Sequence, residues 1–153
     1  MEKDKALSLL YEHVKADSLR GHCIATAAVM KGLAEELSED AGLWETIGIL
    51  HDIDFEEIGE DMTRHGLAGY DILKAAGVGD EIAEPIKRHN HMLFSGEYTT
   101  PVEICLQVAD SVSGLVIACA YVTGGTITDG TPKTGTKKYK QASFAAGCDR
   151  HRC

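Results

Sequence analysis

The chain has 153 residues, of which 44% are hydrophobic and 25% are charged. This length fits one compact domain with a buried core, and the composition is typical of a soluble globular protein rather than a disordered one. The formal net charge of −9 disfavours long nucleic acid as a partner, because binding to its backbone relies on Lys and Arg. A small phosphorylated ligand stays compatible with this charge, since a bound cation can reverse the local field.

No uninterrupted apolar run approaches the roughly 20 residues needed to span a bilayer; the longest covers residues 115–122. The N-terminus is charged and lacks the apolar core and cleavage site of a secretory signal. We therefore expect a cytoplasmic protein with no membrane partner.

Apolar residues recur at helical spacing along almost the whole chain. Asp17 or Ser18 fits the N-cap of the second helix, and Gly77 ends the fourth. Pro85 lies inside the fifth and predicts a kink or a helix start there. The predicted helices cover about residues 3–15, 17–37, 41–51, 66–76, 80–91 and 102–122.

The segments between the helices are polar or rich in glycine, and residues 52–63, 92–100 and 124–135 are interpreted as loops. Residues 136–146 are expected to form short helical pieces, and only residues 121–128 suit an extended conformation. The sequence therefore predicts an all-α protein, a bundle of about six helices built as a single domain over residues 1–153. The chain stops at RHRC without a helix-ending signal, which leaves a truncated C-terminus open.

Four histidines and two aspartates stand out as candidate metal ligands. A single histidine on an apolar helix is more often a hydrogen-bonded core residue than a ligand. These six, however, lie on or beside different predicted helices, apart from one adjacent His-Asp pair, and helical bundles build metal sites from inward-facing side chains. Imidazole and carboxylate together suit Fe, Mn, Co, Ni or Zn. Asp52 is the best-placed bridge between two cations, because a carboxylate can bridge and a neutral imidazole does not. The six candidates are His22, His51, Asp52, His65, His89 and Asp110.

The order of these residues resembles the HD superfamily of metal-dependent phosphohydrolases. The superfamily pattern is a histidine, a His-Asp doublet and a distant aspartate, matched here by His22, by the doublet in ILHDI and by Asp110. Its HDIG-type subgroup of small domain proteins adds two histidines, matched by His65 in HGLAG and His89 in IKRH. The resemblance covers about residues 15–149, and the ordered set of six is specific where the doublet alone is common.

The resemblance implies one or two divalent metal ions per chain, with Fe or Mn favoured and Ni, Co, Zn or Mg as alternatives. The first ion would be held by His22, His51, Asp52 and Asp110, and the second by His65 and His89 with Asp52 shared. Two departures stand beside the match. Asp54 follows the doublet where the subgroup has glycine, which we expect to change the loop more than the ligands. Asn90 stands where some subgroups have a further histidine, so a third metal is not expected.

The resemblance further implies that a metal-activated water hydrolyses a nucleotide or another small phosphate ester. We place Asp52, His89 and Arg88 in the catalytic group, and Lys87, Arg88 and His91 in substrate binding. Arg88 is the best phosphate clamp of the three because of its planar fork. Simpler interpretations stand beside these roles: Lys87 and Arg88 as solvated helix charges, and His91 as the end of its helix.

Two other functions fit the same six ligands. An oxygenase of the HD type uses a di-iron site with this layout, and iron dependence with oxygen uptake would identify it. A noncatalytic metal-containing module that binds a nucleotide would show tight binding without turnover. Glu56 and Glu57 follow the doublet closely and could carry protons, but a solvated acidic loop is the simpler interpretation. The substrate and the oligomeric state stay open, with a homodimer as one option.

Overall fold

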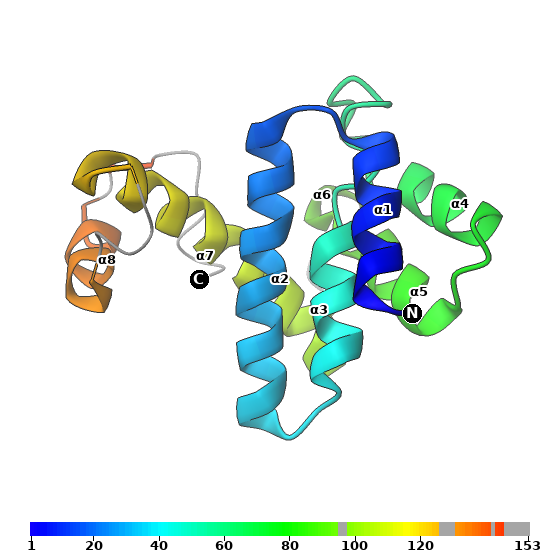
Figure 1. The fold of residues 1–153 in the computed structure, drawn as a ribbon, viewed down its shortest axis with the longest axis horizontal. Coiled ribbons are helices and arrows are strands. Elements are labelled where there is room, and N and C mark those ends of the chain that lie inside the picture. The colour runs from blue at the N-terminus through cyan, green and yellow to red at the C-terminus, as the bar shows by residue number, and fades with distance from the viewer. Residues whose placement is uncertain (95–97, 126–130, 142, 146–153) are drawn as a thin grey trace.

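The computed structural model describes residues 1–94, 98–125, 131–141 and 143–145, and all the regular structure in these ranges is helical (Figure 1). No strand occurs in the ranges described. The helices are α1 (Lys3–His13), α2 (Asp17–Leu37), α3 (Ala41–Leu50), α4 (Leu67–Ala75), α5 (Asp80–Arg88), α6 (His91–Phe94), α7 (Pro101–Thr123) and α8 (Pro132–Tyr139). The predicted all-α class is confirmed.

The central helix is α3, which packs against α1, α2, α5 and α7 (Figure 1). Every residue from Thr46 to Leu50 is buried, and a helix that is apolar on all sides has to be enclosed by others. His51 and Asp52 follow directly after Leu50 and are buried too. The burial of α3 therefore delivers the His-Asp doublet to the interior of the molecule.

The close contact between α2 and α3 depends on a glycine. A Cβ atom at Gly48 would lie only 2.5 Å from the Cα of Ala27 and 2.8 Å from its backbone nitrogen. No residue with a side chain fits there unless the two backbones move apart. This approach sets α2, which carries His22, against the end of α3.

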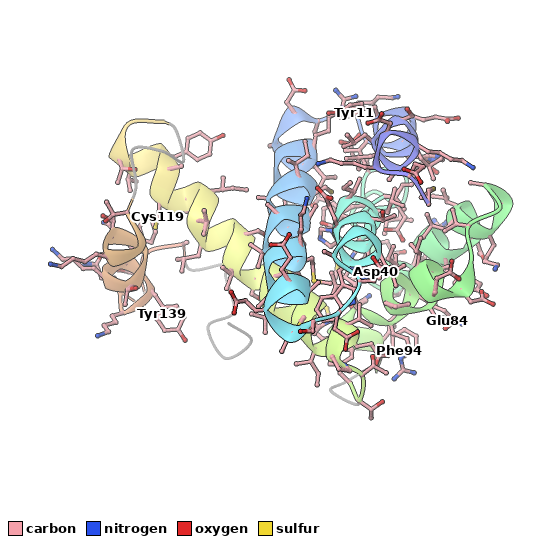
Figure 2. All side chains as sticks on the ribbon, turned by 60° about the horizontal axis from the view of Figure 1, so that its bottom comes forward. Tyr11, Asp40, Glu84, Phe94, Cys119 and Tyr139 are labelled. Atoms are coloured by element: carbon pink, nitrogen blue, oxygen red, sulfur yellow. The ribbon has the colours of Figure 1, made fainter. Side chains whose placement is uncertain are left out.

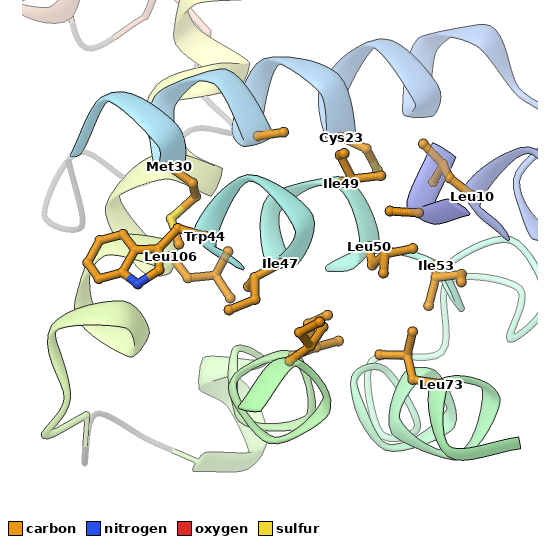
Figure 3. Close-up of a cluster of buried hydrophobic side chains, with 14 of the residues drawn as sticks. Leu10, Cys23, Met30, Trp44, Ile47, Ile49, Leu50, Ile53, Leu73 and Leu106 are labelled. Atoms are coloured by element: carbon orange, nitrogen blue, oxygen red, sulfur yellow. The ribbon is translucent and has the colours of Figure 1, made fainter. Parts of the chain in front are cut away.

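One hydrophobic cluster joins α1, α2, α3, α4, α5 and α7 (Figure 3). Burying a Leu, Ile or Met side chain is worth about 1.5–3 kcal/mol, so this cluster fixes the helices whose ends carry the polar site. Its largest fully buried side chains include Leu10, Met30, Ile47, Ile49, Leu50, Ile53, Leu73, Ile82, Ile86 and Leu106.

The six predicted helices are observed, with ends within three residues of the expected ones, and α5 continues through Pro85. Two short helices differ from the expectation: α6 was not expected as a separate helix, and α8 lies partly in the predicted loop 124–135 and partly in the segment 136–146, where short helical pieces were expected. α6 begins at His91, the last residue of the predicted fifth helix, and continues into the predicted loop 92–100; at its start the Asn90 side chain accepts a hydrogen bond from the Met92 amide. α8 begins inside the predicted loop 124–135, where Thr131 accepts from the Thr134 amide and caps the helix. The expected extended segment 121–128 is also wrong for residues 121–123, which belong to α7, while residues 126–130 lie outside the described ranges.

α7 is 23 residues long, and its most apolar window has a mean hydropathy of 1.6, enough by length and composition to cross a membrane. In this structure 44% of that window is buried, and Leu106 and Ala109 belong to the core. Polar residues interrupt the apolar sequence within α7. A search for uninterrupted apolar runs therefore did not identify this helix as long and apolar enough to cross a membrane. The end of α7 extends past α2 and packs against α8, where Cys119 and Tyr139 lie (Figure 2).

Candidate metal centre

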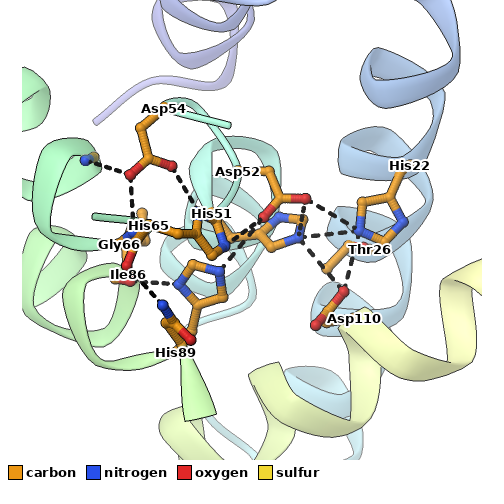
Figure 4. Close-up of polar contacts among 12 residues, drawn as sticks. His22, Thr26, His51, Asp52, Asp54, His65, Gly66, Ile86, His89 and Asp110 are labelled. Carbon is orange, nitrogen blue, oxygen red and sulfur yellow. Dashed lines mark hydrogen bonds and ion pairs between the residues drawn. The ribbon is translucent and has the colours of Figure 1, made fainter. Parts of the chain in front are cut away.

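The six predicted ligands come together at one place, where five helices end, begin or pass (Figure 4). The doublet follows the last residue of α3, and His65 stands just before Gly66, the N-cap of α4. His89 is the first residue after α5. His22 and Asp110 project from within α2 and α7. Residues distant in the chain thus meet because the helices that position them share one core.

The first half of the site contains His22, His51, Asp110 and one oxygen of Asp52. The Nε2 atoms of His22 and His51 are 3.2 Å apart. Asp52 Oδ2 lies 3.5 Å from the first and 3.3 Å from the second. Asp110 Oδ1 lies 3.1 Å from His22 Nε2 and 3.8 Å from His51 Nε2. Two nitrogens and two carboxylate oxygens therefore face a common centre.

The second half of the site contains the other oxygen of Asp52 together with His65 and His89. Asp52 Oδ1 is 3.4 Å from the Nε2 atom of each histidine. The two rings meet edge to face, with centroids 4.6 Å apart. The two oxygens of Asp52 thus face separate groups of imidazole nitrogens, which is the arrangement expected of a bridging carboxylate.

Two of the imidazoles are oriented by the helices that they terminate. His51 Nδ1 lies 2.9 Å from the carbonyl oxygen of Gly48, and His89 Nδ1 lies 2.5 Å from that of Ile86. A carbonyl only accepts hydrogen bonds, so each Nδ1 donates its proton to the carbonyl three residues earlier. In the neutral ring the lone pair is then on Nε2, the atom that faces the centre of the site.

The other two imidazoles are oriented by side chains. Ser113 Oγ lies 3.2 Å from His22 Nδ1 and 2.8 Å from the carbonyl oxygen of Asp110, to which it donates. His65 Nδ1 lies 2.9 Å from Oδ1 of Asp54, a fully buried carboxylate. All four Nδ1 atoms therefore have acceptors that leave Nε2 free to bind a metal.

Electrostatics keep opposite charges together in this site. Burial by itself would lower the pKa of His51, but the charge of Asp52 and hydrogen bonds with the site aspartates outweigh it and raise that pKa well above 6.5. Burial likewise opposes the charge on His65, yet hydrogen bonds to its two aspartate neighbours raise its pKa to about 9. Burial disfavours ionised Asp52, and the facing histidines still hold its pKa well below the usual range. A divalent cation would replace the protons on these imidazoles.

The residues present fit a metal ion. Nε2 of His89 is fully buried and makes no hydrogen bond with any described residue, since its 3.4 Å approach to Asp52 lacks the geometry of one. An unsatisfied buried nitrogen costs free energy, and a cation would satisfy it. Imidazole nitrogens with carboxylate oxygens are suitable ligands for divalent first-row metals.

The predicted substrate-binding residues lie outside this cluster. Arg88 Nε donates to Glu103 Oε1 at 2.7 Å. The Lys87 ammonium group lies 4.5 Å from the centroid of the Tyr70 ring, and the exposed His91 opens α6. None of these contacts tests a role in substrate binding.

The acidic loop after the doublet exposes its glutamates to solvent, and these glutamates also bind the neighbouring connection. Both carboxylate oxygens of Glu56 accept backbone hydrogen bonds, from Lys15 at 2.9 Å and Ala16 at 2.7 Å, and Glu57 pairs with His13 at 2.5 Å. These carboxylates therefore lie at the solvent-exposed surface, as expected, and they also tie the loop to the connection between α1 and α2.

Access to the site is from the side of α2 and α7. The Asp110 and His22 side chains are 28% and 20% exposed, whereas that of His51 is completely buried. Beside His22 lies a cavity of about 330 Å³, walled by residues on the α1–α2 connection, the start of α2 and the loop after the doublet. A cavity of this size suits a small molecule. Its lining residues are Ala16, Ser18, Leu19, His22, Phe55, Glu56 and Glu60.

Sequence reasoning missed Asp54 and Ser113 as partners of the ligands. Asp54 gave a signal, because it replaces the glycine of the subgroup pattern, but that change was assigned to loop shape alone. Ser113 gave none, since it contacts a histidine 91 residues away in the chain.

The model of the HD domain family matches residues 19–115, a segment that contains all six candidate ligands. The chain therefore belongs to the HD domain family. Ribonuclease Y of Fusobacterium nucleatum subsp. nucleatum is 27% identical over 105 residues, which cover 69% of this chain and 20% of that protein. The match thus covers about a fifth of the length of this relative. No solved structure gives a significant match.

Proposed function

We propose that this protein is a metal-dependent phosphohydrolase that acts on a nucleotide or another small phosphate ester. The observation that carries the proposal is the convergence of four imidazole Nε2 atoms on two carboxylates, with the two oxygens of Asp52 facing separate halves of the site. Membership of the HD domain family agrees with this activity. The name of the matched relative, a ribonuclease, also points to cleavage of a phosphate ester.

The six ligands would hold one or two divalent cations, with Fe or Mn favoured. When bound, such cations stabilise charge on phosphoryl oxygens and make a water molecule more acidic. The protein contributes a rigid, largely buried set of imidazoles, so little reorganisation is needed on binding. His22 and Asp110 form the exposed edge at which a phosphate would arrive.

The cavity beside His22 would receive the organic part of the ester. A small substrate agrees with its volume and with the net charge of −9, which disfavours a long nucleic acid. Arg88, Lys87 and His91 stay predictions as substrate-binding groups, and His89 and Arg88 as catalytic ones. A cytoplasmic location belongs to the same proposal.

The test is metal analysis and turnover of protein purified without affinity metal and without oxygen. We expect about two Fe or Mn per chain and hydrolysis of phosphate esters. Asp52→Asn should lose both metals and more than about 100-fold in turnover, because losing even a residue that only supports a ligand costs 10–100-fold. His22→Ala and His65→Ala are matched controls, each expected to lose one metal.

An Asp52→Asn protein with unchanged metal content and turnover would overturn the proposal. Oxygen uptake with iron and no ester hydrolysis would identify the oxygenase instead. Tight nucleotide binding by a metal-loaded protein without turnover of any ester would identify the noncatalytic module.

A further inference from the structure

Asp54 is completely buried, and both of its carboxylate oxygens are used (Figure 4). Oδ1 lies 2.9 Å from Nδ1 of His65. Oδ2 accepts from the backbone amides of Gly66 and Gly69, each at 2.8 Å. The Asp54 side chain thus joins the loop after the doublet to the start of α4 and to the candidate metal ligand His65.

Two glycines make room for this carboxylate and for the turn around it. A Cβ at Gly69 would lie 3.3 Å from Asp54 Oδ2, tighter than an ordinary contact. Gly66 has a φ of +83°, and a Cβ there would lie 2.7 Å from the carbonyl oxygen of Lys87. The two glycines of the HGLAG segment therefore allow Asp54 and the start of α4 to pack closely around His65.

The three hydrogen bonds decide which nitrogen of His65 carries the proton. An ionised carboxylate only accepts hydrogen bonds, so the ring must donate from Nδ1. Its Nε2 lone pair is then directed at Asp52 Oδ1, 3.4 Å away, beside Nε2 of His89. The first half of the site has no such carboxylate, because His51 uses a backbone carbonyl and His22 uses Ser113.

We propose that Asp54 is a positioning residue that fixes the Nδ1-protonated tautomer of His65 and thereby enables the Asp52–His65–His89 half of the site to bind a metal ion. This inference rests on the proposed metal site and goes beyond it, because it makes the second metal depend on a residue that is not a ligand. The first metal is independent of Asp54.

The isosteric variant Asp54→Asn changes the tautomer of His65 while it keeps the size and shape of the side chain at position 54. Its single amide oxygen has to accept from the Gly66 and Gly69 amides, since the NH₂ group would otherwise meet two other donors. The NH₂ group then faces His65 Nδ1 and donates to it, which moves the ring proton to Nε2. A protonated Nε2 cannot bind a metal, although the side chain has kept its size.

The experiment is a calorimetric Zn²⁺ titration of the metal-free full chain, followed by ¹⁵N NMR of the histidine rings in the Zn²⁺-loaded protein. Wild type should bind two Zn²⁺, with the His65 proton on Nδ1. In Asp54→Asn one Zn²⁺ should bind at least about 10–100-fold more weakly, with the His65 proton on Nε2, while the other Zn²⁺ binds as before. Asp61→Asn is the matched control, because the Asp61 carboxylate lies in the same loop and, among the described residues, accepts hydrogen bonds from Thr63 alone; both affinities should be unchanged.

Retention of the first Zn²⁺ shows that Asp54→Asn is folded. If the variant does not fold, the wild-type spectrum decides, and a His65 ring that binds Zn²⁺ through Nδ1 would overturn the inference. Two unchanged affinities in Asp54→Asn would do the same and leave the proposed hydrolase standing. Two Zn²⁺ in wild type, with no hydrolysis of any ester by the Fe- or Mn-loaded protein, would refute the hydrolase and leave the role of Asp54 intact.

Discussion

At the scale of single residues, the site depends on hydrogen bonds to the backbone of the candidate ligands. The carbonyl of His89 accepts from Gln107 Nε2 at 2.8 Å and from Tyr98 Oη at 3.2 Å. Asn90, the next residue, is buried and donates to the carbonyl of His65 at 3.0 Å. The amide at this position therefore links two ligand-bearing segments.

Arg88 has a structural partner as well as a predicted role in binding phosphate. Its guanidinium holds Glu103, which is only 8% exposed. We expect Arg88→Ala to destabilise the fold by about 1–3 kcal/mol, because it removes a charged partner from a nearly buried carboxylate. Arg88→Lys keeps a cation there and should melt close to wild type. Scanning calorimetry of the two variants measures the difference.

The Michaelis constant of the same two variants tests the substrate role. Arg88→Lys lacks the planar fork, so a phosphate clamp at this position predicts a raised KM at an unchanged melting temperature. Unchanged KM values in both variants would leave Arg88 a structural role alone.

At the scale of elements, the site is made by helix ends. α3 and α5 each end immediately before a candidate ligand histidine. The Nδ1 atom of that histidine donates a hydrogen bond to a carbonyl oxygen in the last turn of the helix. α4 begins one residue after Gly66, and the backbone amides of its first turn hold Asp54. The packing of α2 against α3 then sets the separation between the His22 and His51 rings.

We expect Gly48→Ala to lower the stability by about 1–3 kcal/mol, because its Cβ would overlap the backbone of Ala27 and push α2 and α3 apart. The first metal should bind more weakly in this variant, since His22 and His51 lie on those two helices. Gly32→Ala is the matched control: no atom lies within 4 Å of its added Cβ, so a helical alanine should stabilise by roughly 0.5–1 kcal/mol. Thermal unfolding distinguishes the opposite signs, and equal melting temperatures would contradict the packing argument.

At the scale of the whole molecule, the apolar core surrounds a site with at least three carboxylates and four imidazoles. Such a cluster is held together by its own charges, but the buried Nε2 of His89 leaves it incompletely satisfied. A bound cation completes these interactions only in the folded chain, so the metal should contribute to stability.

Metal removal by a chelator should therefore lower the melting temperature. Each site would contribute about 2.7 kcal/mol when free metal is 100 times its dissociation constant, which for a domain of this size is roughly 5–11 °C. Asp52→Asn should lose this dependence, and Asp61→Asn should keep it. A melting temperature that chelation does not change in wild type would show that the metal does not stabilise the fold.

The sequence by itself determined the all-α class, the positions of the six long helices and the six candidate ligands. These features are local: apolar spacing specifies a helix, and the ligand types in their order specify the family pattern. Helix ends were harder, because α6 and α8 are short and their starts depend on single caps, Asn90 and Thr131.

Only the tertiary structure decided how the ligands are presented. Which nitrogen of His22 faces the centre depends on Ser113, 91 residues away. The role of Asp54 depends on amides of α4, and the partner of Arg88 is on α7. Hydrogen bonds between distant segments exist only once the core has set the helices in place, so no local pattern in the sequence could specify them.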